Sequence, residues 1–94
     1  MRVEGFIWLE WVVEKLWVKH HVTVDEVEEV FEDRPKFLRK EKGRVIGEDL
    51  YNALGQTNSG RYLSIFFISK IDKRALIISA RDMDRKERNR YAKK

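Results

Sequence analysis

Apolar residues recur with two different periods along this chain, and the change of period separates helices from strands. The stretch Val3 to Trp8 is rich in β-branched and aromatic residues, which predicts a short strand. The apolar residues that follow are spaced for one face of a helix ending near His20. They are Leu9, Val12, Val13, Leu16 and Trp17. The chain is therefore expected to begin with a strand and an amphipathic helix.

A second, short helix is predicted by capping chemistry as well as by periodicity. Thr23 and Glu26 stand three residues apart, which is the pattern of a capping box. Pro35 ends this helix because proline cannot continue one, and a brief edge strand is expected over Phe37–Lys40. The buried stripe of the helix is expected to consist of Val24, Val27, Val30 and Phe31.

Three closely spaced apolar runs are the strongest evidence for a sheet: Leu50–Gln56, Tyr62–Ser69 and Ala75–Ala80. Turn residues separate them at Asn58-Ser59-Gly60 and over Lys70–Lys73, which predicts an antiparallel meander. The middle run is apolar at both even and odd positions. It is therefore expected to be the central strand, with helices covering one side.

The end of the chain predicts a last helix with little apolar surface. Asp82 is a good N-cap, and the apolar residues beyond it are Met83, Tyr91 and Ala92. The expected fold class is α+β, with a small antiparallel sheet packed by two N-terminal helices and one C-terminal helix. One domain is expected over residues 1–94.

The composition narrows the chemistry that is possible. The 94 residues contain no cysteine, which excludes disulfides, zinc–thiolate sites and a thiol nucleophile, and fits the cytoplasm. Glu4, Glu10 and Glu14 interrupt the apolar N-terminal stretch, so no signal peptide or membrane span is expected. The charged share of 38% resembles that of a thermophile.

The net charge of +4 is distributed unevenly along the chain. Acidic residues outnumber Lys and Arg over residues 1–33, and the reverse holds over residues 81–94. Folding the last hairpin about Ile71 places Arg61 opposite Arg81. Because like charges directly opposite each other are destabilising, this pair indicates an anionic ligand or nearby carboxylates.

Two further arginines continue this cationic pattern. Arg85 and Arg88 follow Arg81 at helical spacings, so four guanidinium groups are expected to share one concavity suited to phosphate. The alternative is that these arginines are solvated or paired with acidic neighbours, as most surface charges are. Those neighbours are Asp82, Asp84 and Glu87.

The two histidines and three tryptophans each allow two interpretations. His20 is a candidate general acid or base, or else it caps a helix C-terminus together with His21. Adjacent histidines point apart, so no metal site is expected. The chain has no Gly-rich phosphate loop, so no nucleotide cofactor is expected either. Trp8 and Trp17 are expected in the core, whereas Trp11 lies off the apolar stripe and is available to stack on an RNA base.

Short pieces of the sequence form a pattern by their order and spacing: Lys19-His20-x-Val22, Glu26-Val27 to Val30-Phe31-x-Asp33, Leu54-Gly55, Gly60-Arg61-x-Leu63, Ile77-Ile78-Ser79-Ala80-Arg81 and Glu87-Arg88-x-x-Tyr91. Together they resemble the BrnT family of toxin–antitoxin ribonucleases. The resemblance implies a fold similar to RelE-type toxins and RNA cleavage without a metal ion. It also implies neutralisation by a cognate ribbon-helix-helix antitoxin.

The resemblance also implies which residues would act. The positions that match the family pattern are His20, Arg61, Arg81, Glu87, Arg88 and Tyr91. The chain departs from the family where it has His21 in place of a common glycine and Leu50 in place of an arginine. The loss of that arginine favours a relative with an altered role.

The leading hypothesis is a metal-independent endoribonuclease in which a ribose 2′-hydroxyl attacks the adjacent phosphate. Arg61 and Arg81 would stabilise the transition-state charge, and Arg85 and Arg88 would contact flanking phosphates. Proton transfer is assigned to His20, with Glu87 or Tyr91 as the second partner. The alternatives are an inactive BrnT-like module that binds RNA or protein, and an interaction protein whose last helix docks onto a partner or forms a homodimer.

Overall fold

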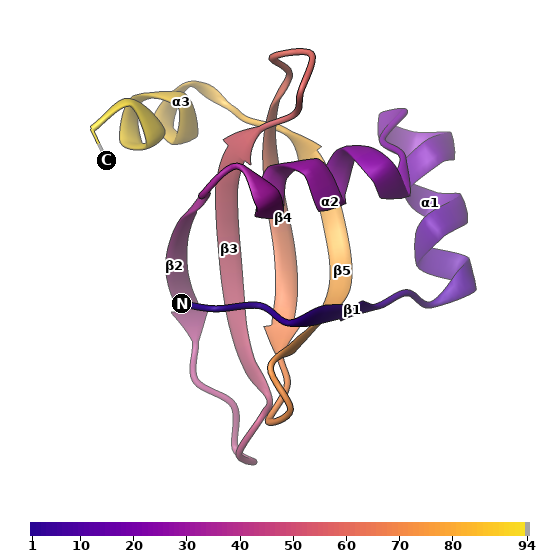
Figure 1. Ribbon diagram of the computed structural model, residues 1–94, viewed down its shortest axis with the longest axis vertical. Helices are drawn as coiled ribbons and strands as arrows, with labels where there is room; N and C mark the ends of the chain where they lie inside the picture. The colour runs from indigo at the N-terminus through magenta and orange to yellow at the C-terminus, as the bar shows by residue number, and fades with distance from the viewer. Residues whose placement is uncertain (94) are drawn as a thin grey trace.

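A five-stranded sheet with helices α1 and α2 on one face forms the body of the computed structural model, which describes residues 1–93 (Figure 1). The strands are β1 (Gly5–Ile7), β2 (Lys36–Glu41), β3 (Asp49–Gln56), β4 (Tyr62–Ser69) and β5 (Arg74–Asp82), and the helices are α1 (Glu10–His20), α2 (Val24–Glu32) and α3 (Arg85–Ala92). The predicted α+β class, with two N-terminal helices and one C-terminal helix, is confirmed. No helix in the described residues is long and apolar enough to cross a membrane.

The strand order is β1-β5-β4-β3-β2, so β4 is the central strand as predicted. Strands β3, β4 and β5 form the expected antiparallel meander, and β2 adds an antiparallel edge after Pro35. β1 pairs in parallel with β5, which makes the sheet mixed. This short strand covers only Gly5–Ile7 of the predicted stretch Val3 to Trp8.

The core lies between the sheet and the first two helices. Successive residues of a strand point to opposite faces, and Leu63, Ile65 and Phe67 of β4 are fully buried on the helix side. They pack against residues of α1 and α2. The helical residues of this core are Val12, Leu16, Val27 and Val30.

The opposite face of the sheet carries polar as well as apolar residues, and we call it the open face. Ser64 and Asn52 are fully buried there, and Leu54 lies beside them. Helix α3 lies apart from α1 and α2, near the ends of β2 and β3 at the top of Figure 1. Of its residues only Tyr91 is buried, so the expectation that this helix docks through little apolar surface is confirmed.

Two local predictions are wrong. The N-cap of α3 is Asp84, because its side chain and that of Glu87 form a capping box, whereas Asp82 is the last residue of β5. Trp17 is 54% exposed rather than in the core, because Val12 and Leu16 occupy the one face of α1 that the sheet covers. Its ring contacts the ring of His21 edge-on, with the centroids 5.3 Å apart.

Gly55 allows α2 and Pro35 to pack closely against β3. A Cβ atom at this position would lie 2.8 Å from Cγ1 of Val30 and 3.2 Å from Cβ of Pro35. We therefore expect Gly55→Ala to lower the free energy of unfolding by about 1–3 kcal/mol through overpacking, measured by urea denaturation. Gly5→Ala is the control, since its Cβ would meet nothing closer than 3.4 Å. Equal stability of the two variants would contradict this packing argument.

Candidate active site

Arg61 and Arg81 do not face each other, so their predicted pairing is wrong. Arg81 lies opposite Ser64, and Arg61 precedes the first residue of β4. Ser69 pairs with Ala75, so the turn is centred at residue 72 instead of Ile71, and a bulge between Phe66 and Phe67 shifts the register by one more residue. The predicted concavity of four guanidinium groups therefore does not form.

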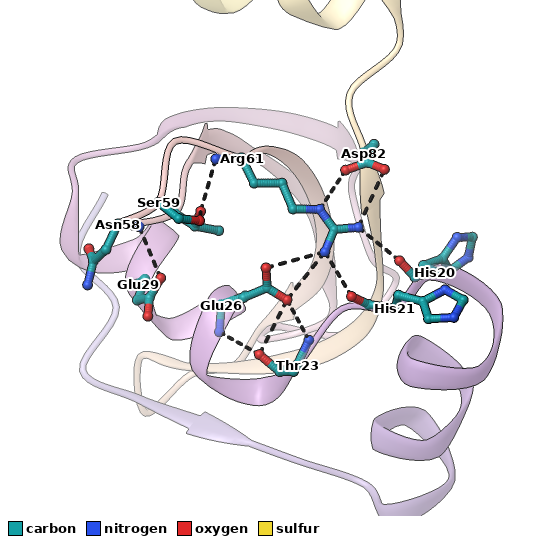
Figure 2. A network of polar contacts seen from close by, with 10 residues as sticks. His20, His21, Thr23, Glu26, Glu29, Asn58, Ser59, Arg61 and Asp82 are labelled. Atoms are coloured by element: carbon teal, nitrogen blue, oxygen red, sulfur yellow. Dashed lines mark hydrogen bonds and ion pairs between the residues drawn. The ribbon is translucent and has the colours of Figure 1, made fainter.

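Arg61 lies on the helix side of the sheet and joins three parts of the fold (Figure 2). Its Nε donates to Oδ1 of Asp82 at 2.7 Å, and its Nη2 donates to Oδ2 at 3.4 Å. Its Nη1 donates to the carboxylate of Glu26 at 3.3 Å and to the carbonyl of His21 at 2.8 Å. The remaining Nη2 donor binds the carbonyl of His20 at 2.9 Å.

All five N–H donors of Arg61 are therefore occupied. The bond to Asp82 is the largest cause that raises the pKa of Arg61, burial opposes it, and Glu26 adds to the rise. The guanidinium is charged at any accessible pH and would have to release a bond before it contacted phosphate. Its geometry is that of a clamp between the end of α1, the start of α2 and the end of β5.

The two histidines contribute backbone carbonyls to this clamp, whereas their imidazole rings point away from the guanidinium (Figure 2). The backbone N–H of His21 caps α1 by donating to the carbonyls of Leu16 and Trp17, and His21 has the left-handed backbone of a C-cap, with φ of 53°. His20 therefore lies on the helix side of the sheet, at the Arg61 clamp.

Arg81 lies on the open face and is paired with Glu87 of α3. Nη1 donates to Oε1 at 2.7 Å and Nη2 donates to Oε2 at 3.0 Å, so the pair is bidentate. Nη1 also donates to the carbonyl of Asp82 at 3.1 Å. Within the described residues, Nε–H and one Nη2 hydrogen have no acceptor. The Arg81 side chain is 36% exposed, so part of it is accessible to an anion.

Glu87 is held by a buried network that reaches into the sheet. Oγ of Ser64 donates to Oε2 of Glu87 at 2.8 Å, and Nδ2 of Asn52 donates to Oγ of Ser64 at 2.9 Å. The backbone N–H of Asp84 donates to Oε1 at 2.9 Å. Burial raises the pKa of Glu87, but the bonds from Arg81, Asp84 and Ser64 outweigh it and leave this pKa below its ordinary value.

The remaining candidates on α3 lie on this same side of the molecule. The Arg88 guanidinium lies over the ring of Tyr62, 3.6 Å from its centroid, and Tyr62 contacts Tyr91 edge-on at 5.9 Å. Arg85 is exposed at the start of the helix. Trp11 belongs to a different surface: it is 59% exposed on α1, with Nζ of Lys15 5.3 Å from its ring centroid.

A pocket of about 410 Å³ adjoins the Arg81–Glu87 pair, between β2, β3 and α3. Its lining residues are Leu38, Lys40, Asn52, Leu54, Asp84, Lys86, Glu87 and Arg90. Asn52, Lys86 and Arg90 were not predicted as site residues from the sequence. Two signals could have found them: Asn52 is a polar residue inside an apolar strand, and Lys86 and Arg90 are four residues apart on one helix.

The Arg61 clamp should contribute to stability because its loss leaves two carboxylates and two helix-end carbonyls without their donor. We expect Arg61→Ala to lower the free energy of unfolding by about 1–3 kcal/mol, and Arg61→Lys to restore only part of it because lysine lacks the planar fork. Urea denaturation measures the change. Arg39→Ala is the control, since Arg39 is 56% exposed and lies 3.9 Å from Asp49. Equal stability of Arg61→Ala and Arg39→Ala would show that the clamp is dispensable.

The depressed pKa of Glu87 predicts a pH dependence. The ionised carboxylate stabilises the fold above the ordinary pKa of 4.5, and this contribution is lost as the pH falls through the lower folded-state pKa. The difference in unfolding free energy between the parent and Glu87→Gln should therefore be present at neutral pH and shrink in acid. Glu32→Gln, at an exposed glutamate, controls for the change of charge. A difference that stays constant with pH would refute the role of ionised Glu87.

Comparison with known families matches residues 8–87 to a model described as the ribonuclease toxin BrnT of type II toxin–antitoxin systems. The matched region covers α1, α2, strands β2 to β5, and both Arg81 and Glu87. A comparison with curated proteins gave no match.

Proposed function

We propose that this chain, which belongs to the BrnT family of ribonuclease toxins of type II toxin–antitoxin systems, is an endoribonuclease that cleaves RNA without a metal ion. The main observation in support is Arg81. Glu87 fixes its guanidinium on the open face, while two of its N–H donors have no acceptor among residues 1–93. A rigidly held cation with uncommitted donors suits a phosphate that gains charge in the transition state.

In the proposed reaction, the 2′-hydroxyl oxygen of a ribose attacks the adjacent phosphorus. The new P–O2′ bond forms as a base removes the hydroxyl proton, and the P–O5′ bond breaks as an acid protonates the leaving oxygen. The products are a 2′,3′-cyclic phosphate and a 5′-hydroxyl. Between these steps the phosphorane carries additional negative charge, which is the charge that a guanidinium neutralises without exchanging a proton.

We assign Arg81 to the phosphorane oxygens and Glu87 first to the orientation of Arg81. Glu87 accepts four hydrogen bonds, so it would have to exchange one before it accepted the hydroxyl proton. Tyr91 is the candidate acid on this side, because its phenol carries an O–H donor. Arg88 and Arg85 are assigned to flanking phosphates.

The other predicted residues belong to the helix side or to α1. A catalytic part for Arg61 and His20 stays a prediction, and it requires that Arg61 release part of its filled donor set. Base stacking on Trp11 also stays a prediction, which its exposure allows.

Membership of a type II toxin–antitoxin family implies an antitoxin partner. We propose that this partner is a ribbon-helix-helix protein and that both act in the cytoplasm. The outer side of α1 offers a surface of the right kind, because Trp11 and Val18 are 59% and 66% exposed and line one hollow. Exposed aromatic and aliphatic residues grouped in this way are typical of protein interfaces.

One observation favours a second candidate function, a BrnT-like module that binds RNA or protein without cleaving it. Leu50 stands two residues before Asn52 on β3, so it lies on the open face with Arg81. An aliphatic residue there supplies no charge to a phosphate. In that case Arg81 and its neighbours would hold RNA but would not promote its cleavage.

Replacement of Arg81 separates these functions. We expect Arg81→Ala to lower the rate of RNA cleavage by about 100-fold or more, as oxyanion-type donors do, while circular dichroism shows a retained fold. The assay uses a fluorescent RNA with and without EDTA, and EDTA should leave the parent rate unchanged. Arg74→Ala is the matched control, because Arg74 lies at the other end of β5 and pairs with Asp72 at 2.7 Å.

Each alternative gives a different result in this assay. Cleavage that is equal in Arg81→Ala and Arg74→Ala would remove Arg81 from the mechanism. RNA binding without cleavage by the parent would establish the second candidate function, and loss of activity in EDTA would refute metal independence.

A further inference from the structure

The pocket between β2, β3 and α3 has cations at its rim and hydrogen-bond acceptors in its lining. Lys40, Lys86 and Arg90 are exposed, whereas Asn52 is fully buried and Glu87 is half-buried. A ligand that fits this arrangement places negative charge at the rim of the pocket and a hydrogen-bond donor in its interior. A nucleotide has these properties when its base enters the pocket and its phosphate stays at the rim.

Asn52 supplies the unsatisfied acceptor. Both hydrogens of its Nδ2 are used, by Oγ of Ser64 at 2.9 Å and by the carbonyl of Ile65 at 3.1 Å. Its Oδ1 is the one buried side-chain polar atom in residues 1–93 without a hydrogen bond. A buried carbonyl without a donor costs free energy. A ligand that supplies the missing donor removes this cost, which favours its binding.

Apart from the three cations at the rim, the other polar groups of the lining are also acceptors. The Asp84 and Glu87 carboxylates bind each other's backbone N–H groups in the capping box of α3. Leu38 and Leu54 add an apolar wall on which the flat face of a base can pack. The lining therefore favours a base edge that carries hydrogens over one that carries oxygens.

The cations at the rim extend into a second hollow. It has a volume of about 390 Å³ and shares Lys86 and Arg90 with the pocket. Its lining residues are Lys36, Lys86, Asn89, Arg90 and Lys93, without a carboxylate among them. A row of cations that leads away from a pocket matches the spaced phosphates of a single strand.

We propose that this pocket binds one nucleotide of single-stranded RNA whose base donates an amino hydrogen to Oδ1 of Asn52, while Lys86 and Arg90 hold the adjacent backbone phosphates. The inference deepens the proposed function, since it rests on RNA being the substrate held near Arg81. Adenine, cytosine and guanine carry such an amino group. Uracil presents one N–H between two carbonyl oxygens, which the acceptors of the lining repel.

Binding to RNA that cannot be cleaved tests the base preference apart from catalysis. Fluorescently labelled 2′-O-methyl oligomers of adenine, cytosine and uracil lack the attacking hydroxyl, and fluorescence anisotropy gives their dissociation constants. We expect the parent to bind the adenine and cytosine oligomers about tenfold more tightly than the uracil oligomer. Equal affinity for all three would overturn the assignment of Asn52.

Variants locate the preference within the pocket. Asn52→Leu should bring the affinities for the three oligomers together, and its fold is checked by circular dichroism. Lys86→Gln and Arg90→Gln lie at exposed positions and test the rim even if Asn52→Leu does not fold. Each should reduce the slope of log K against log salt by about 0.7, the value for one phosphate contact on a single strand.

Lys42→Gln is the matched control for the rim, because it also removes one positive charge. Lys42 follows the last residue of β2, whereas α3 contacts Lys36 at the first. The salt slope of this control should equal that of the parent, and equal slopes for Lys42→Gln and Arg90→Gln would overturn the rim assignment. If the protein binds RNA base-selectively but cleaves none, the proposed function is refuted and the nucleotide-binding role of the pocket is supported. Cleavage without base-selective binding would refute the pocket alone.

Discussion

The buried hydroxyl of Ser64, in the central strand, is the constraint on which the open face depends. A buried polar group needs partners, and Ser64 has Asn52 as donor and Glu87 as acceptor. Glu87 in turn requires a cation, because a carboxylate away from water is costly unless it is paired, and Arg81 supplies it. One hydroxyl in the sheet thus connects β3 to α3 and holds the guanidinium that we place at the centre of catalysis.

Arg61 and Arg81, which the predicted register places opposite each other, lie on opposite faces of the sheet. Arg81 and Asp82 are consecutive residues of β5, so they point to opposite faces, and Arg61 follows Asp82 to the helix side. What distinguishes the two guanidinium groups is the number of N–H donors left without an acceptor. Arg61 has none, which makes it a structural clamp, whereas Arg81 keeps two and is able to bind an anion.

The family match ends at Glu87, within the first turn of α3. Arg81, Glu87 and Asn52 therefore lie in the region shared with BrnT, whereas Arg90 lies beyond it. In the proposed function, Arg81 and Glu87 of the shared region would carry the cleavage chemistry, and Asn52 would select the base beside them. The part of α3 beyond Glu87 would contribute Arg90, which would hold an adjacent backbone phosphate.

The sequence by itself determined the elements, because each depends on local signals. Three apolar runs separated by turn residues predicted the meander, and the run that is apolar on both faces predicted β4 as its centre. Thr23 with Glu26 defined the start of α2. The sequence also identified Arg81 and Glu87 as candidate residues, and it predicted the BrnT family, which the family comparison confirms. The tertiary structure decided the partners: that Arg81 lies opposite Ser64, that Trp17 is exposed, and that Asn52 lines a pocket. The reason is that strand register depends on the exact turn and on a single bulge, and burial depends on which face another element covers. Both are settled by contacts between residues far apart in the chain, which no local pattern encodes.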